Sequence, residues 1–425
     1  MTKTITQGMK WYDWLQYGAM LVMSAAVPVS MNIGLWTAAL LALASLVKLA
    51  ATRRLGNPAL GRGGTIAMWT PVLYWVVILV SALLASDRAT GMGLVGLKAT
   101  LLIFPLSMLV TDTSYLKGLH LRLLFYALWA SCLGVFLYFC GNAVVRLVGG
   151  STLASVVNYT FDPRHHAYTA MYAVSALVFA FLELRNHWRG LRPWLRWLLL
   201  ASLPLLMLYI VIVNSRAGML ILWAVIGLAF VASIRRSWWK SLLFTALAVA
   251  WVLGAQTVLP NHQDRVKATI SAVVDAADDD AVDGDARISI TKSALHRVME
   301  NPLTGYGTGN YRDSLVEQYD RDDFENGTKA RYNAHNQYIE SMLSAGIIGL
   351  IALLLFVFSP LVFALRRAPN AVLPVLFATG IVAGNLLVES MLERQMGLLF
   401  IGWFMVVMIL VVSKEQNKFG QDAKK

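Results

Sequence analysis

The sequence predicts an all-α, polytopic membrane protein. Of its 425 residues, 57% are hydrophobic and only 14% are charged, a composition that no soluble domain of this length requires. The apolar residues are gathered in runs of about 20, the length at which a helix crosses the ~30 Å hydrocarbon layer of a bilayer. Loops rich in Lys and Arg alternate with loops that are poor in them, as in proteins that cross a membrane repeatedly.

We predict about twelve transmembrane helices. They lie near residues 12–29, 32–50, 67–85, 92–111, 120–140, 167–184, 195–213, 218–234, 239–258, 337–365, 371–388 and 396–413. The chain then has three parts. Residues 1–259 hold helices 1–9, residues 260–335 form one large and partly helical loop, and residues 336–425 hold helices 10–12 and a C-terminal tail.

The basic residues set the expected orientation. Twenty-one of the 36 lie in one set of loops and at both termini, whereas the opposite short loops hold five. Those five are Arg88, Arg146, Arg164, Arg216 and Arg394. Because cytoplasmic loops carry the excess of Lys and Arg, we expect both termini and the tail in the cytoplasm. The net charge of +12 is the same bias, so we expect membrane lipids and no nucleic acid as partners.

The segment 260–335 is the one long hydrophilic stretch, and the alternation places it outside. It carries 14 of the 24 acidic residues and nine basic ones, so we expect a small folded element. Residues 264–277 and 287–300 have the apolar spacing of amphipathic helices, the second ended by an Asn-Pro pair. The acidic run 278–285 is interpreted as a solvated turn; a Ca²⁺ site is the alternative, although the spacing does not fit an EF-hand.

No ionisable side chain is predicted at the centre of a span. Lys98 lies about six residues from the outer end of the fourth span, and its amine is expected to reach outward to the headgroups. Ion-coupled carriers usually bury such groups at the midplane, so this pattern argues against a transporter.

Three residues on the predicted outer side are candidates for chemistry: Arg216, Arg287 and His335. Each has a plain structural alternative. Arg216 can anchor to lipid headgroups, Arg287 can pair locally with Asp283 or Asp285, and His335 can simply pack at the interface. A second group is interpreted as a basic interfacial patch, and it contains Arg146, Arg164, His165 and His166.

Together the three candidates suit a lipid-linked diphosphate. Arginine holds phosphate oxygens through a planar fork of donors and stays charged at any relevant pH. His335 is expected at a helix start, where the macrodipole favours the neutral imidazole that can accept a proton from a hydroxyl. His335, Gly346 and Gly349 fall on one stripe of a continuous helix, where the glycines would admit a close neighbour. Asn336 or Asn333 is expected to cap the helix or to orient the imidazole.

These residues resemble a known family. His335 and Asn336, then nine residues to Gly346 and two more to Gly349, match the H-N-x9-G-x-x-G pattern of the O-antigen ligase family. The combination with twelve spans and one large external loop extends the resemblance over essentially the whole chain.

Both arginines take part in the resemblance. Arg216 with Leu220 has the R-x3-L form of the same family. Arg287, followed by a helix and by NPLTGYGTGNY, is similar to the segment before the histidine in the ligase/polymerase superfamily.

The resemblance implies a GT-C-like glycosyltransferase of the Gram-negative inner membrane that uses no metal, ATP or other cofactor. Such ligases move O-antigen from undecaprenyl diphosphate to a sugar hydroxyl of lipid A–core on the periplasmic side. The family's functional residues correspond to Arg216, Arg287 and His335, with Asn336, Gly346 and Gly349 in support. Further candidates for donor or acceptor contacts are Arg88, Arg146 and Arg164.

Alternatives remain open at this stage. An O-antigen polymerase uses the same donor on a similar scaffold, but usually has two sizeable basic external loops, and only residues 260–335 form one here. A protein O-oligosaccharyltransferase usually carries additional C-terminal sequence. A transporter or structural membrane protein is the alternative from another class.

Overall fold

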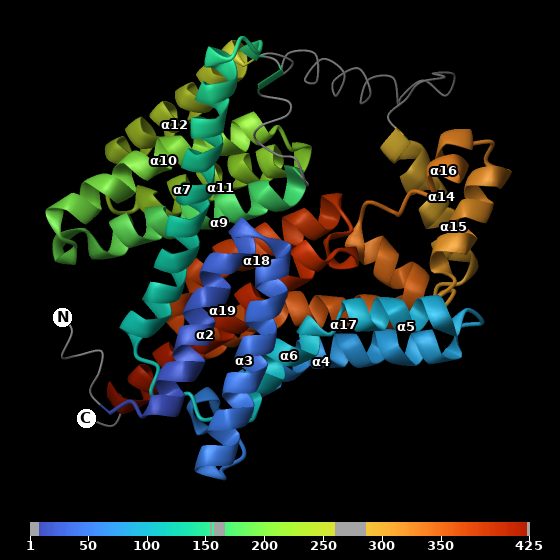
Figure 1. The fold of residues 1–425 in the computed structure, drawn as a ribbon, viewed down its shortest axis with the longest axis horizontal. Coiled ribbons are helices and arrows are strands. Elements are labelled where there is room, and N and C mark those ends of the chain that lie inside the picture. Colours follow the sequence, from blue (N-terminus) through green and yellow to red (C-terminus); the bar gives the residue numbers. More distant parts are fainter. Residues whose placement is uncertain (1–7, 154, 157–165, 260–285, 423–425) are drawn as a thin grey trace.

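The computed structural model describes residues 8–153, 155–156, 166–259 and 286–422. Within these ranges every regular element is a helix. A helix occupies each of the twelve predicted positions: α2 (Trp11–Val29), α3 (Met31–Thr52), α4 (Gly61–Leu84), α5 (Arg88–Leu97) with α6 (Thr100–Leu109), α7 (Gly118–Val148), α9 (His166–His187), α10 (Pro193–Val213), α11 (Arg216–Ile234), α12 (Trp238–Val258), α17 (Gln337–Arg367), α18 (Val372–Val388) and α19 (Gln395–Asp422). The chain is therefore an all-α, multi-pass membrane protein (Figure 1).

The number of spans is slightly lower than predicted. Among the described residues, ten helices are long and apolar enough to cross a membrane, or eleven if α5 and α6 count as one span bent by 47°. The helix outside this set is α2, whose first turns carry the polar residues Asp13 and Gln16. Both are buried, and Asp13 forms an ion pair with Lys48 of α3, with Nζ 2.7 Å from Oδ1. Helix α2 thus packs on its neighbours through polar contacts as well as apolar ones.

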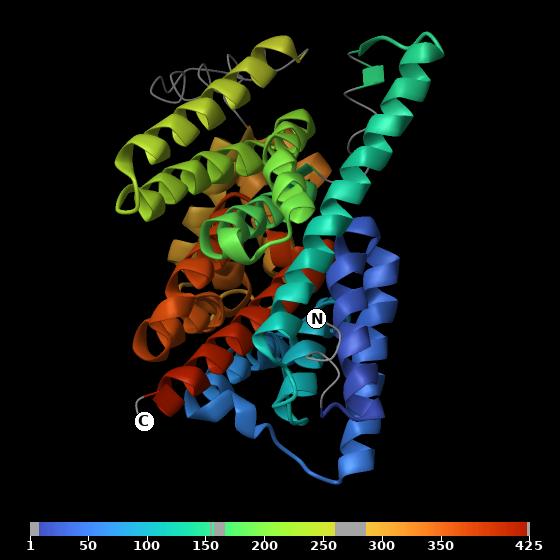
Figure 2. The ribbon, with the colours of Figure 1, turned by 90° about the vertical axis from the view of Figure 1, so that its left-hand side faces the viewer.

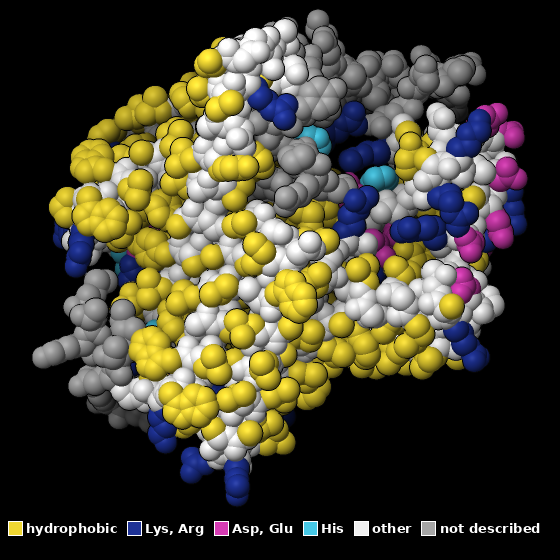
Figure 3. All heavy atoms as spheres, viewed as in Figure 1, with side chains coloured by type: hydrophobic (Ala, Val, Ile, Leu, Met, Phe, Trp, Pro, Cys, Tyr) yellow, Lys and Arg dark blue, Asp and Glu magenta, His cyan; other side chains and the backbone are white. Residues whose placement is uncertain are grey.

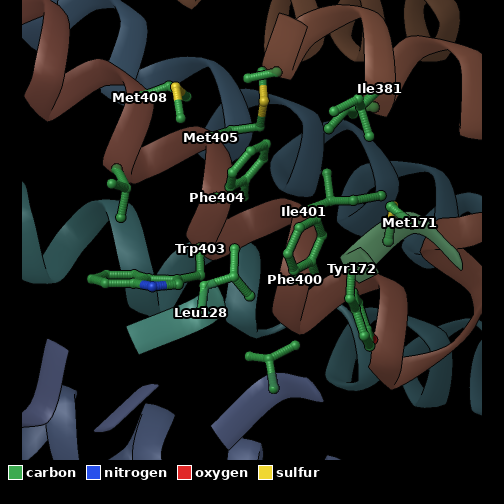
Figure 4. Packing of buried hydrophobic residues seen from close by; sticks show 14 of the residues in the cluster. Leu128, Met171, Tyr172, Ile381, Phe400, Ile401, Trp403, Phe404, Met405 and Met408 are labelled. Atoms are coloured by element: carbon green, nitrogen blue, oxygen red, sulfur yellow. The ribbon is translucent and has the colours of Figure 1, made fainter. Parts of the chain in front are cut away.

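The core of the bundle surrounds α19. This helix is apolar on all sides from Leu398 to Val412, and such a helix is expected to be surrounded by protein. Nearly all of it is buried, and Phe400 packs on Tyr172 of α9 with ring centroids 4.8 Å apart (Figure 4). Trp403 donates its indole N–H to Ser24 of α2 at 2.9 Å. In lipid such close packing and buried hydrogen bonds, rather than the hydrophobic effect, hold helices together.

Helices α9 to α12 form a group beside α19, whereas α2 and α3 lie on another side of it (Figure 2). Helix α2 begins and α19 ends at the same end of the bundle (Figures 1 and 2). The part of the chain that the structure describes also contains four short 3-10 helices: η1 (Pro58–Leu60), η2 (Trp188–Gly190), η3 (Pro369–Ala371) and η4 (Met391–Glu393).

Between α12 and α17, the described residues form three short polar helices: α14 (Ala286–Glu300), α15 (Tyr311–Arg321) and α16 (Glu325–Ala330). Helix α14 confirms the amphipathic helix predicted for 287–300. The helix predicted for 264–277 and the acidic run 278–285 lie outside the described residues. Helices α14 and α15 share a small core, to which Ile290, Leu315 and Tyr319 contribute, and this core includes Leu343 of α17.

Helix α17 is broken, contrary to the prediction of a continuous helix. Ala345 and Gly346 have non-helical backbone angles, and Gly346 adopts φ +62°. The loop before α15 fills the break. The N–H of Ile347 donates to Pro302 O at 2.9 Å, and the N–H groups of Tyr306 and Gly307 donate to Leu343 O and Ser344 O, at 2.7 and 3.1 Å. These bonds provide partners for backbone N–H and C=O groups that have no intrahelical hydrogen bond at the break.

The predicted glycine stripe is therefore wrong. His335 precedes the first residue of α17, Gln337, so it is not on the helix at all. Gly346 stands at the break, where a Cβ would collide with the carbonyl of Leu303. Gly349 follows the break, and a Cβ there would lie 2.5 Å from Ser341 O. Gly346 is required by the break and by the loop that fills it, because its positive φ and the close approach of Leu303 exclude a side chain. Gly349 is required by the close approach of Ser341 and Ala345 from the other side of the break.

Candidate active site

The imidazole of His335 is hydrogen-bonded to a carboxylate. Its Nδ1 lies 2.8 Å from Oε1 of Glu389, the residue that ends α18. The side chains are 29% and 14% exposed, so the pair is shielded but open on one side. A carboxylate only accepts hydrogen bonds, so this contact places the ring proton on Nδ1. In the neutral imidazole, the other nitrogen, Nε2, then carries a lone pair.

The turn before α17 sets the position of the ring. His335 adopts φ +44°, in the left-handed region that few residues other than glycine occupy. Its N–H donates to Oδ1 of Asn333 at 3.2 Å. Asn336 is the N-cap of α17, because its Oδ1 accepts from the N–H groups of Tyr338 and Ile339 at 2.9 and 3.2 Å. The predicted capping role is confirmed.

Arg287 reaches the same carboxylate. It is the second residue of α14, and its Nη2 lies 3.7 Å from Oε2 of Glu389. Glu389 therefore contacts the imidazole with one oxygen and approaches the guanidinium with the other. The alternative local partners of Arg287, Asp283 and Asp285, lie outside the described residues. The Arg287 side chain is 39% exposed, so an anion can approach it from solvent.

Arg216 lies at the same end of the bundle. It is the first residue of α11, whose Gly218 packs directly on Ala170 of α9. Tyr168, also in α9, lies against Gly397 in the first turn of α19. Gly397 in turn lies close to Met391, in the link that joins α18 to α19. The first turns of α9 and α11 are thus neighbours of the link between α18 and α19.

A buried carboxylate joins the two segments that carry the histidine and its partner. Oε2 of Glu340 accepts from the N–H of Ala334 at 3.0 Å and from Oγ of Ser390 at 2.9 Å. Ala334 immediately precedes His335, and Ser390 immediately follows Glu389. Glu340 is only 1% exposed. This one side chain therefore ties together the backbones on both sides of the His335–Glu389 contact.

A buried ion pair lies next to the residues of this site. Lys98 and Glu393 form an ion pair at 2.8 Å, with side chains 2% and 5% exposed. The other oxygen of Glu393 accepts from the phenol of Tyr311 at 3.1 Å. Burial raises the pKa of Tyr311 well above its usual range, so the phenol stays a neutral donor. Gln337 accepts from the N–H of Leu392 at 2.7 Å and so connects the start of α17 to the same link.

The prediction for Lys98 was wrong. Its amine does not reach outward to headgroups but turns inward to Glu393, between α5 and α6. A charge in this setting is stable only when it is paired.

The additional arginines differ in how they relate to the site. Arg88 begins α5 and Arg146 lies in the last turn of α7; both are exposed, and neither forms an ion pair with a described residue. Arg164 lies outside the described residues. In the view of Figure 3, Lys, Arg and His side chains gather in a hollow between α14–α16 and the remaining helices. Among the described residues, no three His, Cys, Asp or Glu side chains converge so as to hold a metal ion.

A comparison with known families matches one segment of the chain. Residues 201–354 match the family model described as O-antigen ligase, a range that contains Arg216, Arg287, His335 and both glycines of the motif. The matched segment is of the O-antigen ligase/polymerase type, within a multi-pass membrane protein. Over this range, about a third of the chain, the protein is similar to the O-antigen ligase family.

A similar curated protein carries no stated activity. An uncharacterised protein of Haemophilus influenzae is 29% identical over 82 residues. The match covers 19% of this chain and 21% of that protein, so the chain spans about a fifth of the relative's length.

Proposed function

We propose that this enzyme transfers O-antigen polysaccharide from undecaprenyl diphosphate to a sugar hydroxyl of lipid A–core. We place the reaction at the periplasmic face of the Gram-negative inner membrane, with both termini in the cytoplasm. The observation that carries the proposal is the hydrogen bond between His335 and Glu389, with Arg287 on the second carboxylate oxygen. It sets a proton acceptor beside a phosphate-binding side chain.

His335 is the proposed general base. With the ring proton on Nδ1, Nε2 takes the proton of the acceptor hydroxyl as the oxygen attacks the anomeric carbon. Glu389 does not touch the substrate; it holds the imidazole in this tautomer and stabilises the imidazolium that forms. A base in this role contributes roughly 10²–10⁴-fold to the rate.

Arg216 and Arg287 are the proposed ligands of the diphosphate. As the new glycosidic bond forms, the bond from the anomeric carbon to the diphosphate oxygen breaks, and the charge passes to undecaprenyl diphosphate. Two guanidinium groups stabilise that charge, a task that needs no metal ion in this scheme. Attack opposite the leaving group inverts the anomeric carbon. Arg88, Arg146 and Arg164 are proposed as further donor or acceptor contacts.

The ligase is preferred to the polymerase for one reason. The described structure has one polar insertion, α14–α16, between α12 and α17, and the donor-binding Arg287 belongs to it. A polymerase of this type usually presents two such loops. The polymerase remains the second candidate because its donor is the same.

Lipopolysaccharide from a deletion strain separates the candidates. Loss of a ligase leaves bare core and polymerised glycan on the prenyl carrier, whereas loss of a polymerase leaves core with a single repeat. A protein-directed transferase or a transporter would give neither pattern.

Purified protein tests the mechanism directly. With prenyl-diphosphate glycan and lipid A–core, His335→Ala is expected to reduce transfer by at least about 10²-fold while the protein remains folded. Full transfer by this variant would refute the base assignment. Activity should also persist in a chelator; inhibition that Mg²⁺ or Mn²⁺ reverses would refute the metal-free scheme.

A further inference from the structure

A cavity of about 700 Å³ lies at the opposite end of the bundle from His335. It forms where η1, the link between α6 and α7, and the last turns of α17 and α19 meet. The length of α17 separates it from His335 by about 40 Å, at 1.5 Å per helical residue. It therefore has no part in the transfer reaction.

The walls of this cavity carry only positive charge. Arg366, Arg367 and Lys414 line it, and no Asp or Glu does. None of these three cations forms an ion pair with a residue in the described part of the chain. Unpaired charges of one sign around a hollow concentrate the electrostatic potential inside it and attract an anion.

The cavity lies at the level where a membrane surface is expected. Arg366 and Arg367 end the apolar span that begins at Gln337, and Lys414 lies in the last turns of the span Gln395–Lys418. Leu116, Leu121 and Leu410 give the cavity an apolar wall. An anion with an attached hydrocarbon chain fits both kinds of wall.

Exposed apolar side chains of α17 precede the two arginines that line the cavity. Val362 and Leu365, just before the two arginines, are 44% and 61% exposed on a helix long enough to cross the membrane. An acyl chain could pack against these apolar side chains while Arg366 and Arg367 bind the headgroup.

We propose that this cavity binds the phosphate group of an anionic phospholipid. The guanidinium groups would hold phosphate oxygens through paired N–H donors, and the Lys414 ammonium would add a third positive charge. A soluble phosphate shares this chemistry, but only a lipid also uses the apolar wall and the exposed face of α17. By the charge distribution of the loops, the leaflet is the cytoplasmic one, where anionic lipids attract basic pockets between helices. This binding site is independent of the proposed reaction.

The test measures lipid binding and not transfer. The full-length protein in detergent is titrated with phosphatidylglycerol, phosphatidylcholine or inorganic phosphate, and bound lipid is counted by native mass spectrometry. The variant R366Q/R367Q/K414Q removes the three cations. The matched control R53Q/R54Q/R62Q removes three arginines from the same end of the bundle that do not line the cavity.

Wild type and control are expected to bind phosphatidylglycerol, and phosphatidylcholine only weakly. Each cation near an anionic lipid strengthens binding about fivefold, so the triple variant should bind on the order of a hundredfold more weakly. The single variant R366E, at an exposed residue, should show part of this loss if the triple variant fails to fold. Equal losses in the control would refute a specific cavity, and displacement of lipid by equimolar inorganic phosphate would refute the lipid assignment.

Discussion

His335 and Glu389 are 54 residues apart in the chain, yet Nδ1 of the first lies 2.8 Å from Oε1 of the second. The two come from different helix ends, the start of α17 and the end of α18. Helices α17 and α18 pack along each other, which brings these ends together. The contact turns an isolated histidine into an oriented pair, because the carboxylate determines which nitrogen carries the proton.

The first prediction concerns Glu389. Glu389→Ala removes the acceptor of the Nδ1 proton, so the imidazole can rotate and adopt the other tautomer. Transfer should fall by about 10²–10⁴-fold, as when an orienting carboxylate is lost from a similar pair. Steady-state transfer by purified protein, with folding checked by thermal unfolding, measures this.

A double variant provides the control for the first prediction. If Glu389 acts only through His335, then His335→Ala/Glu389→Ala should be no slower than His335→Ala alone. Independent, multiplicative losses would show that Glu389 has a separate role, such as placing Arg287.

The second prediction concerns Glu340. Its Oε2 accepts from Ala334 N–H and from Ser390 Oγ in a fully buried position. Glu340→Ala leaves both donors without an acceptor, and each such loss costs about 1–3 kcal/mol of unfolding free energy. We expect a clear fall in the unfolding temperature together with slower transfer.

The matched change for Glu340 is Glu340→Gln, which keeps an oxygen acceptor of the same reach. It should retain most of the stability and activity. If the Ala and Gln variants were equally impaired, the charge rather than the two hydrogen bonds would be what the site requires.

The positions of the helices were predictable, whereas the partners of the site residues were not. Runs of about 20 apolar residues locate spans because a bilayer has a fixed thickness. The sequence does not reveal that Glu389 meets His335, since that contact depends on how α17 and α18 pack. Two carboxylates in the short link between the last two spans, Glu389 and Glu393, were nevertheless a usable signal, because that side of the protein has few short-loop acids.

Two wrong predictions have the same origin. The stripe of His335, Gly346 and Gly349 assumed an unbroken helix, and periodicity alone does not show the φ of +62° at Gly346. The inward direction of the Lys98 side chain could not be predicted, because its partner, Glu393, is 295 residues away in the sequence. In both cases a segment distant in sequence, the loop at Pro302 or the link at Glu393, determines the local structure.

The third prediction concerns the buried ion pair. Lys98→Met leaves the carboxylate of Glu393 buried with hydrogen-bond donors but without its ion-pair partner. Breaking one side of a buried pair typically costs about 3–5 kcal/mol. The free energy of unfolding in mixed micelles should fall by that order, and Lys98→Met/Glu393→Gln should recover part of it. A double variant no more stable than the single one would show that the two charges are not coupled.

The fourth prediction concerns the break in α17. Gly346 has φ +62°, and a Cβ at this position would collide with the carbonyl of Leu303. Gly346→Ala must therefore either strain the backbone, at about 1–3 kcal/mol, or displace the loop that fills the break. Displacement would release the bonds from Tyr306 and Gly307 to α17 and shift α14, which carries Arg287. We expect lower stability and a higher KM for the prenyl-diphosphate donor.

The control for Gly346 is Gly380, in the helical interior of α18, where an added Cβ would meet no atom within 4 Å. Gly380→Ala should be neutral or stabilise the protein by up to about 1 kcal/mol, because alanine favours the helix. Both variants are compared by thermal unfolding and by KM. If Gly346→Ala behaved like Gly380→Ala, the break would not depend on glycine, and the motif glycine would need another explanation. If only stability changed and KM did not, the loop would hold α17 without positioning Arg287.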